Sequence, residues 1–326
     1  MHRIFLLLLC CCFYRAAYAQ ELRREDFIVI DINARSFGAM KKMSLGAIVD
    51  SLATVCTAEQ QVTRELQLTR AFYYWLTHQI TFDCKAFHRP KQSPASASAA
   101  LMERKATSEG YARLFKAMCD LVHIKCEVVT GIYRWRLEDI GQFDPEARHY
   151  WNIIQVENTR FLVDASLGGG ETDEAVKRFT VKYTDAWWLA NRLCFALTHY
   201  PDDNTLQLVE VPLTKQEVSQ APLVHAAAIV AGVIPARSTK GVLRGREDTS
   251  LQVKCNPQRA DVIRGITLSY DAGPPQRAVY TQDEFGLWIT LPYGPEGEHR
   301  LEVYVNDGLT FTFKTMSRPA PKKIKR

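Results

Sequence analysis

The chain has 326 residues, of which 47% are hydrophobic and 24% are charged, and its net charge is +5. This length has room for about two domains of ~150 residues each, and the composition is that of a packed globular protein. The excess positive charge is small and lies partly in the tail at 322–326. No basic patch interleaved with aromatic residues is present, which argues against a nucleic-acid-binding protein.

The N-terminus has the pattern of a secretory signal peptide. His2 and Arg3 precede an apolar run at Ile4–Tyr14, and Ala17-Tyr18-Ala19 supplies small residues for cleavage. The run is too short to cross a bilayer, which takes about 20 residues, and no later segment reaches that length. We therefore predict a signal peptide at 1–19, cleaved after Ala19, and a secreted or periplasmic protein with no integral membrane segment in the mature chain. A lipoprotein cysteine at 10–12 is a weaker alternative because leucines precede it.

The cysteines do not form a recognisable metal site. Six of the nine lie outside the predicted signal peptide: Cys56, Cys84, Cys119, Cys126, Cys194 and Cys255. No C-x-x-C or Cys/His ligand spacing is present, so we expect no metal and no other cofactor. Export permits disulfides, but their connectivity cannot be read from the spacing, and small buried thiols are the simpler expectation.

The first half of the mature chain is mainly helical. A short extended segment is predicted at 27–32, and apolar residues at three- and four-residue spacing predict two helices between Ser44 and Thr81, with Ser44 as the first N-cap. The stretch S-P-A-S-A-S-A-A at 93–100 is low in complexity and predicts a loop. A helix is expected at about 109–123. Strands are expected after it at 126–131, 150–157 and 159–164, with a long loop at 135–148 before the second strand.

The last third changes to a period of two. Alternating segments at 251–255, 266–270, 278–280, 287–291 and 301–305 are separated by Gly-, Pro- and Asp-rich turns. Short strands at this spacing predict a small antiparallel β-sandwich of Ig-like type at 243–317, after a linker at 223–242 and before a basic tail at 318–326.

Three separated motifs have the order of a thiol-enzyme site. K-A-T-S-E-G-Y-A-R-L-F begins at Lys105, H-Y-W-N begins at His149, and F-L-V-D-A-S contains Asp164. This order resembles the transglutaminase-like superfamily of papain-like folds, in which a helix opens with a cysteine in a pattern close to G-x-C-x-G-Y-A. A-F-Y-Y-W-L-T-H-Q-I-T-F-D at 71–83 also resembles the signature that precedes the family's active-site loop.

A further block resembles one branch of that superfamily. D-A-W-W-L at 185–189 and H-Y-P-D-D-N-T-L-Q-L-V-E-V-P-L-T at 199–214 are similar to segments of the kyphoscoliosis-peptidase and hillarin branch, although Leu206 stands where the branch usually has Trp. The resemblance implies an α+β fold, with a papain-like core of helices packed on an antiparallel sheet at 20–222, followed by the all-β sandwich.

The resemblance places Ser108 at the nucleophile position, with His149 and Asp164 as its partners and Trp151 and Tyr111 as substrate-binding residues. A thiolate is favoured at a helix N-terminus beside an imidazolium, whereas a hydroxyl titrates far above neutral pH and needs a general base and an oxyanion hole matched to oxygen. Ser108 by itself would also serve as a helix N-cap. Neither Cys119, about 16 Å along the helix, nor Cys84, beyond the low-complexity loop, is well placed to replace the thiol.

Three functions remain open from the sequence. The first is a non-catalytic, exported protein that binds polypeptide or cell-surface protein material. The second is a peptidase or acyl transferase that uses Ser108, His149 and Asp164, which would be a cysteine-type triad if the natural residue at 108 were cysteine. The third is an adhesion or scaffold protein whose β-sandwich is the working part.

The exported protein should begin at Gln20, because Ala17-Tyr18-Ala19 follows a short apolar run. Intact-mass measurement of protein recovered from the culture medium or periplasm tests this. A mass that still includes residues 1–19 would show that the segment is not a cleaved signal peptide.

Overall fold

The computed structural model describes residues 24–58, 62–89, 95–144, 147–246, 250–257, 263–283 and 285–319. The predicted signal peptide at 1–19 lies outside them, as does most of the predicted basic tail. The chain packs as two compact units. The first comprises Met1–Val128 and Tyr150–Trp188, and the second comprises Val129–His149 and Leu189–Arg326. Among the described residues, no helix is long and apolar enough to cross a membrane.

The first unit is rich in helices. Its helical elements are η1 (Arg24–Phe27), α2 (Ile28–Ser36), α3 (Leu45–Ala53), α4 (Arg64–Gln79), α5 (Cys84–Phe87), α6 (Ala97–Glu103), α7 (Ser108–Leu121) and α8 (Ala165–Gly168). Serine and threonine begin several of them. Ser44 accepts from the Ala47 amide at 3.2 Å, which confirms the predicted N-cap of α3, and Ser96 accepts from Ala99 at the start of α6.

Two of the sequence expectations for this unit are wrong. The segment at 27–32 is not extended, because α2 begins at Ile28 and buries Ile30, Asp31 and Ala34 at helical spacing. The stretch at 93–100 is not wholly a loop, because its alanines enter α6 from Ala97 onward. At 27–32 a tertiary contact favours the helix, and at 97–100 the high helix propensity of alanine favours it.

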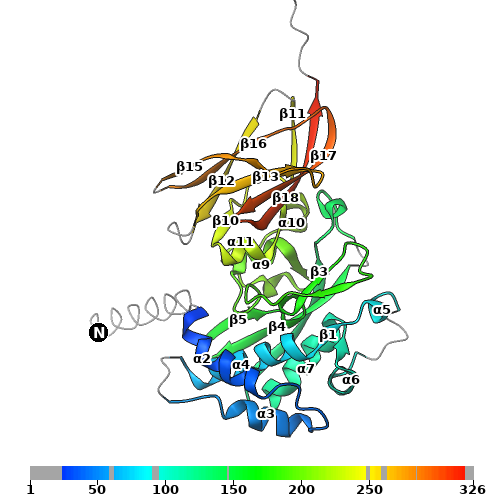
Figure 1. Cartoon of the computed structure of the whole chain (residues 1–326), viewed down its shortest axis with the longest axis vertical. Coiled ribbons are helices and arrows are strands. Elements are labelled where there is room, and N and C mark those ends of the chain that lie inside the picture. Colours follow the sequence, from blue (N-terminus) through cyan, green and yellow to red (C-terminus); the bar gives the residue numbers. More distant parts are fainter. Residues whose placement is uncertain are drawn as a thin grey trace, which may run out of the picture. The chain divides into compact units, whose positions relative to one another are not determined.

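The strands of the first unit pair in short ladders. β1 (Thr81–Phe82) pairs parallel with β2 (Lys105–Ala106), and β6 (Gly170–Thr172) pairs antiparallel with β7 (Phe179–Val181). The larger ladder joins β4 (Arg148–Val156) to β5 (Thr159–Val163) in antiparallel register, with Asn152 opposite Val163. Helices α2, α3, α4 and α7 lie on one side of β4 and β5 (Figure 1), which confirms the predicted helices on an antiparallel sheet.

A buried arginine connects the helices of the first unit. Arg70 on α4 is 1% exposed, and its guanidinium forms two bonds to the Asp31 carboxylate of α2, at 2.8 and 2.6 Å. The same group donates to the Tyr183 hydroxyl at 3.1 Å. Burial alone would lower the pKa of Arg70, but the hydrogen bond and charge of Asp31 raise it above its usual range.

The second unit is built mainly from strands. Its helical elements are η3 (Leu137–Asp139), α9 (Arg192–Thr198), η4 (Asn204–Gln207), α10 (Lys215–Gln220) and α11 (Ala226–Val230). Its strands are β8 (His199–Pro201), β9 (Leu223–Val224), β10 (Val233–Pro235), β11 (Val242–Arg246), β12 (Ser250–Pro257), β13 (Ile266–Tyr270), β14 (Gln276–Arg277), β15 (Val279–Asp283), β16 (Gly286–Pro292), β17 (Gly297–Val305) and β18 (Gly308–Arg318). The second half of β3 (Lys125–Tyr133) pairs with β8 here.

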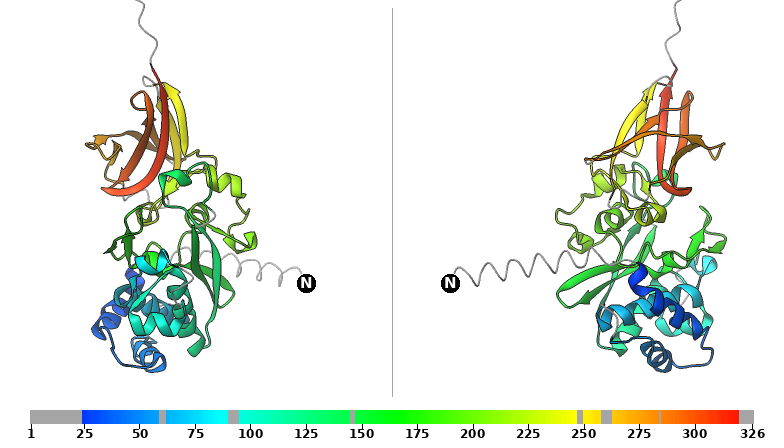
Figure 2. Two further views of the ribbon diagram at one scale, coloured as in Figure 1. Left: turned by 90° about the vertical axis from the view of Figure 1, so that its right-hand side faces the viewer. Right: turned by 60° about the vertical axis from the view of Figure 1, so that its left-hand side comes forward.

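Two sheets make the predicted β-sandwich. One has the strand order β10-β12-β16-β15, and the other has the order β11-β18-β17-β13-β14, with β9 added beside β18. Figure 2 shows the long curved strands β17 and β18, in orange to red. Both sheets contribute to one apolar core, which includes Leu287 and Ile289 of β16 and Phe311 and Phe313 of β18. Each alternating segment predicted from the sequence overlaps one of these strands.

The predicted linker at 223–242 contains ordered elements. β9 pairs with β18, β10 pairs with β12, and α11 lies between them in the chain. The predicted domain boundaries and the Ig-like type of the sandwich stay predictions.

Replacing Arg70 with alanine should lower the free energy of unfolding by about 3–5 kcal/mol, because Asp31 would remain buried without its partner. Denaturant titration followed by circular dichroism measures this. Arg113→Ala is the matched control, since the Arg113–Glu109 pair on α7 is exposed and such pairs contribute only ~0.5 kcal/mol. Equal losses in the two variants would mean that the buried pair does not hold the helices together.

Candidate functional site

Ser108 is the first residue of α7. The N-cap position belongs to Thr107, whose side chain makes no capping bond, so the alternative in which Ser108 is the N-cap is wrong. Ser108 is 6% exposed, and within the described part of the chain no hydrogen bond to its hydroxyl is found. An N1 side chain lies beside the unbonded N–H groups and the positive end of the helix dipole, which is the environment that stabilises a thiolate in thiol enzymes.

The glycine two residues later explains why α7 packs closely at this end. A Cβ on Gly110 would lie 2.7 Å from the Ala106 Cβ and 3.5 Å from the Ala100 Cβ. Only glycine lets the first turn of α7 approach β2 and α6 so closely. Packing therefore requires the glycine of S-E-G-Y, whatever the chemistry at Ser108.

Tyr111 and Trp151 lie in the protein interior, and each is 1% exposed. The Tyr111 hydroxyl donates to the Ile80 carbonyl, and burial, with a smaller effect of the Asp164 charge, raises its pKa above the usual range. This bond connects α7 to the end of α4. The role of both residues toward a substrate stays a prediction.

Asp164 directly follows β5 and is the N-cap of α8. Its carboxylate is 1% exposed and accepts three bonds at Oδ1, from the Ser166 amide at 2.9 Å, the Ser166 hydroxyl at 2.7 Å and the Leu167 amide at 3.1 Å. The Asp164 amide donates to the Trp187 carbonyl at 3.0 Å. These bonds hold the carboxylate in one orientation, which a residue that orients a catalytic histidine must have.

His149 is the second residue of β4 and is 7% exposed. Within the second unit, its ring lies 5.0 Å from the ring of Tyr133 and 5.4 Å from that of His199, measured between ring centroids. His199 stacks on Phe195 at 3.8 Å, and its Nδ1 lies 2.7 Å from the Thr198 hydroxyl oxygen.

His199 is a candidate that the sequence interpretation left without a role. The signal was present, because His199 opens the H-Y-P segment that resembles the kyphoscoliosis-peptidase branch. Its proximity to His149 depends on the pairing of β3 with β8, in which Tyr133 lies opposite His199. That pairing joins residues far apart in the chain and could not be read from local periodicity.

Asn152 connects β4 to α7 within the first unit. Its Nδ2 donates to the Ala112 carbonyl at 3.0 Å, one helical turn beyond Ser108, and to the Glu127 carbonyl at 3.4 Å. Asn152 on β4 lies opposite Val163, the last residue of β5, and Asp164 is the next residue after Val163. His149 lies three residues before Asn152, about 10 Å along the strand. The boundary between the two units falls within β4, between His149 and Tyr150. His149 therefore belongs to a different unit from Ser108 and Asp164, and the approach of its imidazole to these two residues stays a prediction.

The loop that leads into His149 depends on a buried arginine, Arg134, which no sequence motif indicated. Its guanidinium is 2% exposed and donates to four backbone carbonyls, those of Asp139, Leu197, Ser219 and Ala221. Burial lowers its pKa to about 10. Arg134 therefore joins the loop after β3 to α9 and α10 inside the second unit.

Comparison with known proteins identifies the family of the segment that contains the candidate site. Residues 52–164, which include Ser108, His149 and Asp164, match the transglutaminase-like superfamily. The chain carries a transglutaminase-like domain. The human relative described as kyphoscoliosis peptidase is 29% identical over 291 residues, which cover 88% of this chain and 42% of the relative. The mouse relative of the same description is 27% identical over 250 residues, or 75% of this chain and 36% of the relative.

The chain spans less than half the length of these two relatives. A solved structure described as the crystal structure of a TGase covers 56% of this chain and 42% of its own, at 14% identity and a TM-score of 0.28. That score is too low for a comparison of the sites.

Neither Cys84 nor Cys119 offers an activated thiol in place of Ser108. Burial raises the pKa of both Cys84 and Cys119, which keeps them protonated at neutral pH. Neither of these two thiols therefore replaces a nucleophile at residue 108.

Replacing Ser108 with cysteine should create a reactive thiol. The N-terminus of α7 and a protonated His149 would both favour the thiolate, so the new residue should react with iodoacetamide at about pH 6, where an unperturbed cysteine is almost wholly protonated. Trypsin cleaves after Lys105 and Arg113, so the peptide at 106–113 carries the new thiol and no other cysteine. Mass spectrometry of that peptide measures the rate.

Two further variants identify the cause of the reactivity. In the Ser108→Cys background, His149→Ala should slow alkylation sharply, and Asp164→Ala should slow it less, because it acts through the imidazole. A thiol at 108 that reacts no faster than a free cysteine would show that the three residues do not converge, and the site assignment would be wrong.

Proposed function

We propose that this protein is an exported, non-catalytic member of the transglutaminase-like superfamily that binds polypeptide or cell-surface protein material. The observation that carries the proposal is the oxygen of Ser108 at the first residue of α7, where the family frame has a thiol. A helix N-terminus and an imidazolium can bring a thiol pKa below 7 but leave a serine hydroxyl protonated. Loss of an effective nucleophile can lower the rate of such an enzyme on the order of 10⁶-fold.

The name of the two relatives supports polypeptide as the ligand class. Both are described as peptidases, and a domain that keeps the fold but loses its nucleophile retains residues that contact the substrate. The second unit adds a β-sandwich, an architecture common in proteins that recognise other proteins outside the cell. The apolar run with Ala17-Tyr18-Ala19 after it supports export.

A second candidate function is a serine-type peptidase or acyl transferase that uses Ser108, His149 and Asp164. The fixed Asp164 carboxylate favours it, because a triad requires a third group that orients the histidine. The requirement that this candidate must still meet is an oxyanion hole matched to oxygen. The two functions differ in one measurable property, which is whether Ser108 forms a covalent intermediate.

A fluorophosphonate probe should leave Ser108 unlabelled in the protein as it exists, because an unactivated hydroxyl does not attack phosphorus at a useful rate. The peptide at 106–113 in a tryptic digest is the site to examine, with Ser108→Ala as the matched control. In the same preparations, a fluorescent casein digest should bind equally to both proteins, measured by anisotropy. Probe labelling that Ser108→Ala abolishes would overturn the non-catalytic proposal in favour of the serine enzyme.

A further inference from the structure

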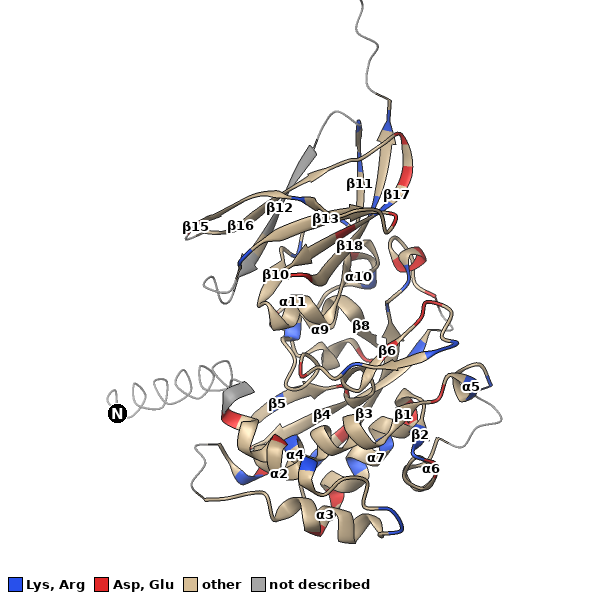
Figure 3. Ribbon diagram, viewed as in Figure 1, with Lys and Arg blue, Asp and Glu red and all other residues tan. Residues whose placement is uncertain are grey.

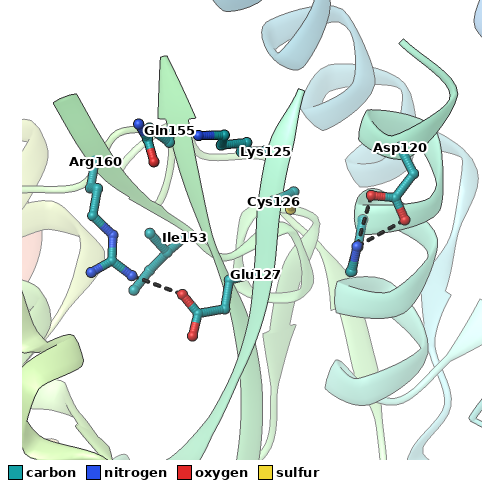
Figure 4. A pocket seen from close by; sticks show the side chains of 8 residues that line it. Asp120, Lys125, Cys126, Glu127, Ile153, Gln155 and Arg160 are labelled. Carbon is teal, nitrogen blue, oxygen red and sulfur yellow. Dashed lines mark hydrogen bonds and ion pairs between the residues drawn. The ribbon is translucent and has the colours of Figure 1, made fainter. Parts of the chain in front are cut away.

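A groove in the first unit gives access to a cysteine. The groove has a volume of about 520 Å³ and is lined by residues of α7, β3, β4 and β5, with Cys126 among them. In Figure 4, Cys126 and Glu127 extend from β3, Asp120 stands on the neighbouring helix α7, and Arg160 reaches toward Glu127 from the other side. Two ion pairs frame the opening, Lys116–Asp120 at 2.7 Å and Arg160–Glu127 at 2.8 Å.

The Cys126 side chain points toward α7. Asn152 shows this directly, because its single Nδ2 lies 3.5 Å from the Cys126 Sγ and 3.0 Å from the Ala112 carbonyl of α7. Cys119 lies two turns after Ala112 and therefore on the same face of the helix. Cys119 is 0% exposed, whereas Cys126 is half-buried and lines the groove.

The turn between α7 and β3 brings the two cysteines together. His123 adopts a left-handed conformation with φ of 59°, and the Ile124 amide returns to the Cys119 carbonyl at 3.0 Å. β3 then starts at Lys125 and runs back along the helix. Burial, and after it the neighbouring Cys126 thiol, raise the pKa of the Cys119 thiol.

We propose that Cys119 and Cys126 form a reversible disulfide, made by exchange with a small anionic disulfide such as oxidised glutathione that enters the groove. The groove carries three cations, Lys116, Lys125 and Arg160, against the two carboxylates of Asp120 and Glu127. The groove therefore has an excess of positive charge, which suits a ligand that carries carboxylates. The disulfide joins the end of α7 to the start of β3.

The exchange takes two steps. The Cys126 thiolate attacks one sulfur of the small disulfide, and the other sulfur leaves as a thiolate. Cys119 then loses its proton and attacks the Cys126 sulfur of the mixed disulfide, releasing the second small thiolate. The two cysteines are oxidised by two electrons, and the small disulfide is reduced to two thiols. Because burial keeps Cys119 protonated, the second step should accelerate as the pH rises.

Trypsin separates the two thiols and makes the test direct. Cleavage after Lys116, Lys125 and Arg134 leaves Cys119 in the peptide at 117–125 and Cys126 in the peptide at 126–134. The folded, reduced full chain is incubated with oxidised glutathione at about pH 9, where thiolates are abundant. Free thiols are then blocked with N-ethylmaleimide, and the digest is examined without reduction. The cross-linked pair of peptides should become the main form of both cysteines and should disappear on reduction.

Three variants sharpen the result. Cys126→Ser should leave Cys119 unmodified, because the buried thiol is not reached from the groove. Cys119→Ser, and Cys119→Ala as a second choice if the serine disturbs folding, should instead accumulate a glutathione adduct on Cys126. Cys194→Ala should still give the 119–126 cross-link, because Cys194 lies in the apolar core of the second unit. Far-UV circular dichroism verifies that each variant is folded.

Either of two outcomes in the folded wild-type chain would overturn the proposal. One is a stable glutathione adduct on Cys126 with no cross-link, which would mean that Cys119 cannot reach it. The other is an unmodified Cys126, which would mean that the groove does not admit the disulfide. Both outcomes are independent of Ser108 and leave the proposed binding function untouched.

Discussion

The bidentate pair between Arg70 and Asp31 is the interaction on which the first unit depends. A charge at this depth is costly to desolvate, and a paired carboxylate and further contacts offset that cost. Asp31 takes two of its N–H groups, the Tyr183 hydroxyl takes another bond, and the rings of Phe27, Tyr73 and Trp188 lie 5.5, 5.9 and 5.9 Å from its central carbon. One side chain on α4 therefore holds α2 and the 183–188 segment in place (Figure 1).

Arg134 is a buried arginine of the second unit, and its hydrogen-bond partners differ from those of Arg70. Its guanidinium bonds to backbone carbonyls rather than to a carboxylate, and its pKa falls accordingly, whereas that of Arg70 rises. Carbonyl dipoles satisfy the donors but supply no opposite charge. The exposed charges differ from these two buried arginines. Lys and Arg (blue) lie close to Asp and Glu (red) on the helices of the first unit (Figure 3). Exposed pairs of this kind contribute little to stability.

Several residues of the candidate site have structural roles that do not depend on its chemistry. Gly110, Tyr111 and Asn152 position α7 against its neighbours through a close approach and two buried hydrogen bonds. These constraints would persist whether or not residue 108 performs chemistry, which is how a superfamily can keep its frame after a nucleophile changes. Cys119 lies near the other end of α7 and Cys126 near the start of β3, so the proposed disulfide is separate from the candidate site at Ser108.

Local sequence patterns determined a large part of this protein. Apolar periodicity predicted α4, α7 and the strands of the sandwich, and the motif order predicted the superfamily, because backbone period and chain order are properties of the sequence itself. The site at residues 108, 149 and 164 stays a prediction. Tertiary structure decided the rest. Residues 27–32 became helical because Asp31 meets Arg70, 39 positions away, and His199 came beside His149 because β8 pairs with β3. Such contacts depend on which distant segments pack together, and no local pattern carries that information.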